Sequence, residues 1–261
     1  MTENKKHILD FTVRQNLRLG TNYALLKLMP TGGQLPPCEP GQFAQVLVPN
    51  SKNTFLRRPI SICNIDRNEN LLWLLVRRAG EGTAALCDLH EGDILNVMLP
   101  LGHGFTLHRD GTTLLVGGGV GVAPLFMLGK VLKEQGMQPV FLLGARSKGD
   151  LLLIDKFTEL GEVHITTDDG SAGVHGVVTK HPVLTGGNMA HIACCGPMPM
   201  MRAVAALARR QGIDCEVSLE NLMACGMGAC LCCVEDTADA GNVCVCTEGP
   251  VFNINRLKWQ I

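Results

Sequence analysis

The chain has 261 residues and a formal net charge of −1 at pH 7. This length is too great for one small core and fits two compact domains with a small third unit. The near-neutral charge gives no electrostatic reason to expect a nucleic acid or an anionic membrane as a partner. The longest apolar runs, such as residues 71–76, are too short to span a bilayer, and the first residues lack a signal-peptide pattern. We therefore expect a soluble, cytoplasmic protein with no nucleic-acid and no membrane partner.

Residues 1–108 consist mainly of short β-rich runs separated by turn-forming residues. The runs cover residues 7–19, 23–30, 41–49, 57–65, 71–78 and 93–100. Several of them alternate apolar and polar side chains, and Gly-Gly, Pro-Pro and Asn-rich breaks lie between them. This part predicts an antiparallel β-barrel, with its clearest helix pattern directly after Gly82.

The pattern changes at about residue 109. Up to residue 212, buried-looking strands alternate with helical patterns, which predicts a parallel α/β sheet with helices on both faces. The strands are expected at 113–118, 139–145, 163–169 and 191–196, and the helices at 123–136, 151–161 and 199–212. Residues 213–261 lose this pattern and are rich in Cys, Gly and Met, so this third unit would need a metal to hold it together.

Six of the 12 cysteines lie between residues 225 and 246. Such clustering in a chain without an export signal favours a metal site over disulfides. Cys225, Cys230 and Cys233 have the spacing C-x4-C-x2-C, which is typical of plant-type [2Fe–2S] proteins and requires a fourth cysteine later in the chain. The glycines at 226 and 228 allow the loop to turn its N–H groups towards the sulfurs.

Two points about this cysteine cluster remain open on spacing alone. Either Cys244 or Cys246 can supply the fourth thiolate. A zinc site of four thiolates, or a set of buried structural thiols, uses the same residue type. The C-x4-C-x2-C spacing with an interposed Gly-x-Gly favours iron–sulfur over these two alternatives.

A glycine-rich turn joins a predicted strand to a predicted helix at residues 112–124. The turn carries Gly118, Gly119 and Gly121, and Pro124 lies in the first turn of the helix. Glycines of this kind let the backbone approach a pyrophosphate, whose charge the helix N-terminus stabilises. The same glycines also suit an ordinary tight βα turn, so the motif by itself is ambiguous.

A second loop of the same kind contains Cys195, Gly196 and Pro197, after a strand and before a helix. Two such loops at the carboxyl ends of parallel strands would border one crevice, which is where open α/β sheets bind ligands. Cys195 is either a contact to a nicotinamide or a small core residue.

A short motif in the barrel has the residue types for a phosphate contact. Arg58, Pro59, Ile60 and Ser61 lie on a predicted strand, where an arginine can form a forked contact with a phosphate and a hydroxyl can reach a ring nitrogen. The run Leu75-Val76-Arg77 and the turn with Gly82 and Thr83 can add a second phosphate contact. The alternative for the arginine is a solvated strand end.

The order of these motifs resembles that of the ferredoxin–NADP reductase superfamily. Between about residues 7 and 212 the chain contains, in this order, RPIS, GEGT, LLVGGGVGVAPL and CCGPMPMM. In that superfamily the barrel binds a flavin and the second domain binds a nicotinamide nucleotide. The C-terminal ENLMACGMGACLCCV and CTEGPVF are similar to the electron-transfer subunit of B-type dihydroorotate dehydrogenase, so the resemblance covers nearly the whole chain.

This resemblance implies cofactors and ligands. It implies FAD on the barrel, bound by Arg58, Pro59, Ile60, Ser61, Leu75, Val76, Arg77, Gly82 and Thr83, and NAD at Gly118, Gly119, Gly121, Pro124, Cys195, Gly196 and Pro197. The family's fourth cluster ligand immediately precedes an x-x-Gly-Pro-Val-Phe signature, which selects Cys246 over Cys244. Asp168 and Asp169 are candidates for disfavouring the 2′-phosphate of NADP.

The resemblance also implies a partner and a direction of electron flow. The partner is an FMN-containing catalytic subunit that oxidises dihydroorotate, in a heterotetramer of two of each chain. Electrons would pass from its FMN through the [2Fe–2S] cluster and FAD to NAD+, in pyrimidine (UMP) biosynthesis. No residue of this chain is expected to act as acid or base on dihydroorotate.

Two other functions fit parts of the pattern. The first is the flavin and iron–sulfur subunit of an NAD(P)H-dependent ferredoxin reductase or sulfide dehydrogenase, which has a similar layout. The second is a redox sensor or scaffold without enzymatic activity, which would leave the flavin and nucleotide loops without a purpose.

Overall fold

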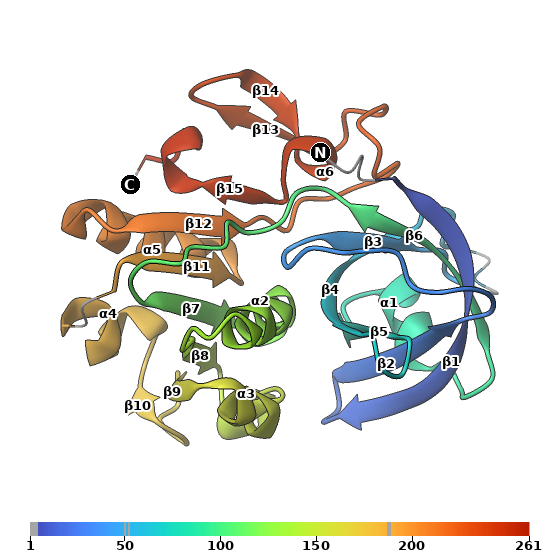
Figure 1. The fold of residues 1–261 in the computed structure, drawn as a ribbon, viewed down its shortest axis with the longest axis horizontal. Coiled ribbons are helices and arrows are strands. Elements are labelled where there is room, and N and C mark those ends of the chain that lie inside the picture. The colour runs from blue at the N-terminus through green and yellow to red at the C-terminus, as the bar shows by residue number, and fades with distance from the viewer. Residues whose placement is uncertain (1–4, 50, 52, 187–188, 261) are drawn as a thin grey trace.

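The first part of the chain folds into a closed barrel of antiparallel strands. The computed structural model describes residues 5–49, 51, 53–186 and 189–260. The barrel strands are β1 (His7–Leu19), β2 (Tyr23–Pro30), β3 (Phe43–Val46), β4 (Arg58–Asp66), β5 (Leu71–Arg77) and β6 (Ile94–Leu101), in the order β1-β2-β5-β4-β3-β6. They lie on the right of Figure 1, and they confirm the predicted barrel.

Strand β5 explains why its sequence is apolar throughout. Leu72, Leu74 and Val76 point into the barrel core. Leu71, Trp73 and Leu75 point the other way, into a core shared with the second domain. Because side chains alternate between the two faces of a strand, a strand buried on both faces loses the polar half of its pattern. The barrel is therefore joined to its neighbour by a continuous apolar layer.

A single helix, α1 (Glu81–Cys87), follows β5 and ends at Asp88. The Asp88 carboxylate accepts hydrogen bonds from Arg18, at 2.8 Å, and from Arg78. The bond from Arg78 is the main reason why the pKa of Asp88 falls from 3.8 to about 2. Arg18 belongs to β1 and Arg78 directly follows β5, so this carboxylate fastens the helix end to the barrel.

We expect the stabilisation from Asp88 to be present at pH values above 4 and to be lost as the pH falls towards 2, because its pKa is lower in the folded state. Asp88→Asn should lower the urea midpoint at pH 6, and the difference from the parent should shrink between pH 5 and pH 3. Urea unfolding at a series of pH values tests this. Glu69→Gln, which removes an exposed carboxylate elsewhere on the barrel, is the control, and a constant difference for Asp88→Asn would contradict the prediction.

The second domain is built on a seven-stranded sheet with the order β10-β9-β8-β7-β11-β12-β15. Its strands are β7 (Thr113–Gly118), β8 (Val140–Ala145), β9 (Glu162–Thr167), β10 (Val174–His175), β11 (His191–Cys195), β12 (Asp214–Ser218) and β15 (Val251–Asn253), parallel except for β15. The longer helices are α2 (Val122–Glu134), α3 (Ile154–Leu160), α4 (Pro182–Gly186) and α5 (Met198–Gln211). The parallel α/β prediction is confirmed.

Helices cover both faces of this sheet. Leu114 and Val116 of β7 pack in the core that contains α5, whereas Leu115 packs in the core that contains α2 and α3. Helix α2 lies between the sheet and the barrel, where Lys130 Nζ is 3.4 Å from Asn64 Oδ1 of β4 (Figure 1). The arrowheads of β7, β11 and β12 in Figure 1 point towards the barrel, so the carboxyl ends of these strands lie on the barrel side of the sheet.

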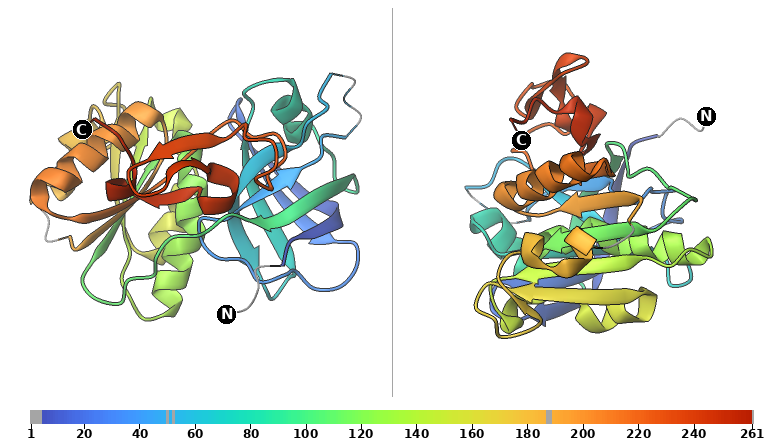
Figure 2. Two further views of the ribbon diagram at one scale, coloured as in Figure 1. Left: turned by 90° about the horizontal axis from the view of Figure 1, so that it is seen from above. Right: turned by 90° about the vertical axis from the view of Figure 1, so that its left-hand side faces the viewer.

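The C-terminal segment forms a small unit over the junction of the two domains (Figure 2). It contains the hairpin β13 (Val234–Thr237) and β14 (Gly241–Cys244) and the short helix α6 (Val245–Glu248), and it returns to the sheet as β15. The Gly249 carbonyl accepts the His103 N–H at 2.6 Å, which ties the unit to the linker between barrel and sheet. Within the described part of the chain, no helix is long and apolar enough to cross a membrane.

Candidate functional site

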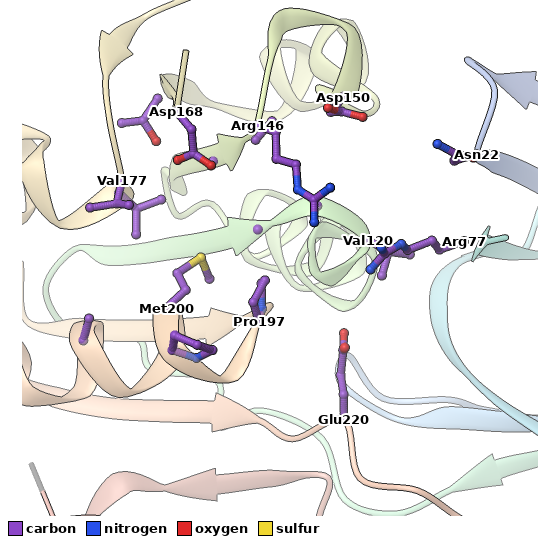
Figure 3. A pocket seen from close by; sticks show the side chains of 18 of the residues that line it. Asn22, Arg77, Val120, Arg146, Asp150, Asp168, Val177, Pro197, Met200 and Glu220 are labelled. Carbon is purple, nitrogen blue, oxygen red and sulfur yellow. The ribbon is translucent and has the colours of Figure 1, made fainter. Parts of the chain in front are cut away.

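A cavity of about 620 Å³ opens where the barrel meets the carboxyl ends of the parallel strands (Figure 3). The barrel contributes polar side chains to it, the sheet contributes loop residues, and the start of the C-terminal segment adds a carboxylate. Its lining includes Asn22, Tyr23, Arg77, Arg78, Gly118, Gly119, Val120, Arg146, Asp150, Asp168, Val177, Pro197, Met200 and Glu220. An elongated ligand can thus contact the barrel and the sheet at once.

The two predicted nucleotide loops lie directly against each other at this cavity. A Cβ atom on Gly118 would lie 2.6 Å from Met200 Sδ and 3.0 Å from Pro197 Cδ. A Cβ atom on Gly121 would lie 2.5 Å from the carbonyl oxygen of Cys195. The neighbour of Gly121 is backbone, and only glycine allows such close backbone approach, so the second loop requires a glycine at position 121.

The predicted nucleotide residues divide into a lining set and a supporting set. Gly118, Gly119 and Pro197 line the cavity. Gly121, Pro124, Cys195 and Gly196 lie behind the lining, where Pro124 is buried in the first turn of α2. Burial raises the pKa of Cys195 well above its usual value, so its thiol stays protonated beneath the cavity. Cys195 is buried and is not among the residues that line the cavity, so a ligand in the cavity does not contact it directly.

Sequence reasoning missed a glutamate in the cavity wall. Glu220 retains an exposed surface because the cavity is open, yet the surrounding walls remove much of the water that would solvate its carboxylate. This desolvation raises the pKa of Glu220, and the positive charge of Arg77 partly opposes it. Both side chains face the cavity in Figure 3. The available signal was position, because Glu220 lies just beyond the carboxyl end of β12, on the edge where ligands bind.

Sequence reasoning also missed Arg146, which lines the cavity. Its signal was again its position, directly after the carboxyl end of β8. The two aspartates of the next loop have different positions. Asp168 lines the cavity. Asp169 instead accepts hydrogen bonds from the Ser171 hydroxyl, at 2.6 Å, and from its N–H, and these bonds lower the pKa of Asp169. Of the pair, Asp168 is the residue placed to meet a ligand.

The predicted FAD residues lie at the start of β4, at the end of β5 and in the first turn of α1. Arg58, Pro59, Ile60 and Ser61 are the half-buried end of β4, whose next four residues are fully buried. A Cβ atom on Gly82 would lie 2.7 Å from Arg58 Nε, so the glycine turn directly contacts the arginine side chain. No carboxylate in the described ranges pairs with Arg58, which leaves its charge available for a phosphate. These residues fit a bound FAD.

The other predicted FAD residues have separate roles. Leu75 and Val76 are buried within β5, and Arg77 at the strand end lines the cavity. The Thr83 hydroxyl accepts the Ala79 N–H at 2.9 Å and donates to the Gly80 carbonyl. Thr83 therefore shapes the turn that holds Gly82 against Arg58.

Three of the four predicted cluster ligands, Cys225, Cys230 and Cys233, lie in one loop, and the fourth, Cys246, lies beside it in α6. The Met227 N–H donates to Cys225 Sγ at 3.3 Å, the Gly228 N–H to Cys246 Sγ at 3.1 Å and the Cys246 N–H to Cys233 Sγ at 3.4 Å. Cys230 lies close enough to donate to the Cys225 sulfur, which the Met227 N–H stabilises most. The Met227 N–H, followed by the Cys230 N–H and thiol and the Ala229 N–H, lowers the pKa of Cys225 to about 6, so its thiolate is favoured at neutral pH.

Cys232 and Cys244 have a different environment. The Cys232 thiol faces the Leu222 carbonyl and the Cys244 thiol faces the Gly228 carbonyl, each at 3.7 Å. A carbonyl only accepts, so it favours a protonated thiol, whereas the N–H groups at the sulfurs of Cys225, Cys233 and Cys246 favour thiolates. At Cys246 the Gly228 N–H opposes burial, which raises the pKa of this thiol to about 12. This contrast supports Cys246 over Cys244 as the fourth ligand.

The cluster loop packs against the barrel strand next to the FAD residues. Gln45 of β3 pairs in register with Pro59 of β4. A Cβ atom on Gly226 would lie 2.7 Å from Gln45 Cγ, so the glutamine touches the loop beside Cys225. The Gln45 amide is fully buried, and neither its nitrogen nor its oxygen has a hydrogen-bond partner among the described atoms. An unpaired buried amide at this place fits a sulfur-rich group held by the loop.

Family models match two parts of the chain. Residues 220–258 match the iron–sulfur cluster binding domain of dihydroorotate dehydrogenase B, and residues 115–206 match an oxidoreductase NAD-binding domain. The electron transfer subunit of dihydroorotate dehydrogenase B (NAD(+)) from Fusobacterium nucleatum is 38% identical over 94% of this chain and 96% of its own. The subunit of the same name from Bacillus cereus strain B4264 is 39% identical over 84% of this chain and 86% of its own.

Solved structures show the same architecture. A chain of the NADH-dependent reduced ferredoxin–NADP oxidoreductase superposes with a TM-score of 0.85 at 29% identity, over 95% of this chain and 90% of that one. The flavohaem-like FAD/NAD binding domain of a nitric oxide dioxygenase from Vibrio cholerae shares the fold, with a TM-score of 0.71 at 20% identity, over 80% of this chain and 98% of that one. With these relatives over nearly its whole length, the chain belongs to the family of dihydroorotate dehydrogenase B electron transfer subunits.

Proposed function

We propose that this chain is the electron transfer subunit of an NAD-dependent dihydroorotate dehydrogenase. The observation that supports this most directly is the contact between Gln45 and Gly226, because it places the cysteine loop beside the barrel strand that would hold the flavin. When bound, FAD exchanges a hydride with NAD+ and single electrons with the [2Fe–2S] cluster, so the chain carries electrons from the FMN of its partner to NAD+ for pyrimidine (UMP) synthesis.

Each part of the chain has its own role in this proposal. Residues 1–108 would hold FAD, 109–212 NAD and 213–261 the cluster, with residues 1–4, 50, 52, 187–188 and 261 outside the described ranges. Two strands of the last segment, β12 and β15, complete the nucleotide-binding sheet. Arg58 would hold the FAD phosphate, and Cys225, Cys230, Cys233 and Cys246 would hold the iron. The chain itself binds and orients the cofactors and leaves dihydroorotate to its partner.

The surface around the cysteine loop supports a protein partner there. Leu222, Met227 and Leu231 are 85%, 52% and 66% exposed, which is unusual for large apolar side chains so close together in sequence. We propose that the FMN-containing catalytic subunit covers them, in a cytoplasmic heterotetramer of two of each chain. This contact would bring the partner's flavin to the exposed side of the cluster.

Co-expression with a dihydroorotate dehydrogenase catalytic subunit tests the proposal. The purified complex should reduce NAD+ with dihydroorotate, and the catalytic subunit alone should not. Leu222→Glu should prevent the complex from forming while the isolated chain keeps FAD, iron and NADH-dependent reduction of an artificial acceptor. Failure of the parent complex to reduce NAD+, with all cofactors present, would favour the alternative of a ferredoxin reductase or sulfide dehydrogenase subunit, whose layout is shared by the solved structure at 29% identity.

We expect Asp168 to favour NAD+ over NADP+, because its carboxylate lines the cavity and would repel a 2′-phosphate. Asp168→Asn should therefore lower the ratio of kcat/KM for NADH to that for NADPH by about tenfold, which corresponds to roughly 1.4 kcal/mol. Steady-state reduction of an artificial acceptor with each nucleotide measures it. Asp169→Asn is the matched control, since Asp169 is turned to Ser171 and its loss should leave the ratio within about twofold. An unchanged ratio for Asp168→Asn would contradict the prediction.

A further inference from the structure

Two histidines and an aspartate meet at the edge of the nucleotide-binding sheet that lies opposite the cavity. His108 comes from the linker that leaves the barrel, His191 is the first residue of β11, and Asp214 is the first residue of β12. The cavity is lined at the carboxyl ends of the same sheet, beyond Cys195. These three side chains therefore belong to neither cofactor site.

The spacing of these three side chains suits one metal ion. Asp214 Oδ2 lies 3.4 Å from His108 Nε2 and 3.5 Å from His191 Nδ1, and the three ligand atoms are all within 4.8 Å of one another. In a tetrahedral zinc site with bonds of 2.0–2.2 Å, neighbouring ligand atoms are about 3.4 Å apart. Two of the three separations thus match the edges of such a tetrahedron.

Hydrogen bonding leaves a lone pair of His191 directed at the carboxylate. His191 Nε2 lies 3.1 Å from the Asp110 carbonyl oxygen, which only accepts, so Nε2 carries the proton. In the neutral ring Nδ1 is then an acceptor. It is buried and has no hydrogen-bond partner among the described atoms, and it faces the Asp214 oxygen, which is also an acceptor. Two acceptors that face each other in this way are stabilised by a cation between them.

Two neighbours hold these ligands in the orientation that metal sites use. A metal-binding histidine usually donates its second N–H to a carbonyl or carboxylate, as His191 does to Asp110. The other oxygen of Asp214 accepts a hydrogen bond from Asn253 Nδ2 at 2.7 Å, which fixes the carboxylate. Asn253 belongs to β15, so the site joins the linker, the sheet and the C-terminal strand.

We propose that His108, His191 and Asp214 bind a divalent transition metal of the zinc type, with water as the fourth ligand. Two imidazole nitrogens and one carboxylate oxygen suit zinc better than magnesium or calcium. The two rings stack at a centroid distance of 3.6 Å and an angle of 9°, and metal bonds lie in the plane of each ring. Two stacked rings cannot both direct a lone pair at one ion, so binding requires the His108 ring to turn out of the stack. Its place on a linker, and not on a strand, allows this turn. The ion fastens the interdomain linker to the sheet.

Zinc uptake by the holoprotein tests the proposal. The [2Fe–2S] cluster must be in place so that its cysteines are occupied, and loosely held metal is first removed with a chelator. Equilibrium dialysis against Zn2+ followed by metal analysis should show roughly one more zinc per chain in the parent than in His191→Asn or Asp214→Asn. Asn253→Ala, which keeps the ligands but frees the carboxylate, should weaken binding about tenfold.

The second histidine pair of the protein provides a matched control. His164 and His181 have ring centroids 4.8 Å apart, and His164→Asn and His181→Asn should leave zinc uptake unchanged. FAD and iron contents show that every variant is folded, and zinc should raise the Tm of the parent but not of His191→Asn. Equal zinc uptake by the parent and the His191 and Asp214 variants would overturn the proposal. Absence of bound zinc in a parent that holds both FAD and the [2Fe–2S] cluster would do the same.

Discussion

Replacing Cys246 with alanine is expected to abolish the iron–sulfur cluster, whereas replacing Cys244 is expected to leave it intact. The reason is the hydrogen bonding at each sulfur: the Gly228 N–H points at Cys246, and the Gly228 carbonyl faces the thiol of Cys244. A thiolate ligand needs the first environment and not the second. Cys246→Ala should lose about two irons per chain, because three thiolates do not complete the plant-type ligand set.

Iron and sulfide analysis of the purified variants measures this, with the visible absorption of the cluster as a second readout. FAD content is the control for folding, since the FAD residues lie on the barrel and should retain the flavin in both variants. The Cys232→Ala variant should behave like Cys244→Ala, because its thiol also faces a carbonyl. A cluster that survives in Cys246→Ala and disappears in Cys244→Ala would show that the fourth ligand is Cys244.

Replacing Gly121 with alanine is expected to destabilise the nucleotide-binding domain by about 2–3 kcal/mol, as for other overpacked positions. Gly121 has a φ of −62°, a helical conformation in which alanine is normally better than glycine. We expect a loss of stability because of a steric clash: the new Cβ would lie 2.5 Å from the Cys195 carbonyl oxygen and 2.6 Å from Gly196 Cα. Both are backbone atoms, which cannot move aside as the end of a flexible side chain can.

Thermal unfolding of the holoprotein should show this as a decrease in Tm of about 5–10 °C. NADH binding should weaken as well, because the loop that the new methyl group displaces contains Pro197, which lines the cavity. Gly149→Ala is the matched control in the same domain: its Cβ would meet only Ser147 Oγ at 3.8 Å, so its Tm should stay close to that of the parent. If the two variants have the same Tm, the contact between the two loops does not constrain Gly121.

The C-x4-C-x2-C spacing shows why local patterns were informative here. Cluster ligands, glycine turns and buried parallel strands depend on residues close together in the sequence, and they predicted the barrel, the α/β sheet and the family. Strand β5 was recognised as a strand for the same reason. That both of its faces are buried was not predictable, because the second face packs on α2 and α3, which come later in the chain.

Glu220 and Arg146 illustrate the limit of such patterns. Neither belongs to a recognisable motif, and their place in the cavity depends on which strands are neighbours in the sheet. The segment after residue 212 looked irregular in sequence, yet its first residues form β12 beside β11. Had that strand been recognised, the residue just beyond its carboxyl end would have been a candidate for the site.

By itself, the sequence determined the cluster spacing, the two glycine loops, the order of the domains and the family, because each rests on short-range pattern. The tertiary structure alone decided which sulfurs receive N–H groups, how Gln45 meets Gly226 and how His108, His191 and Asp214 come together. These arrangements join residues that are far apart in the chain. Their positions follow from strand order and packing, which bring together side chains that no local pattern connects.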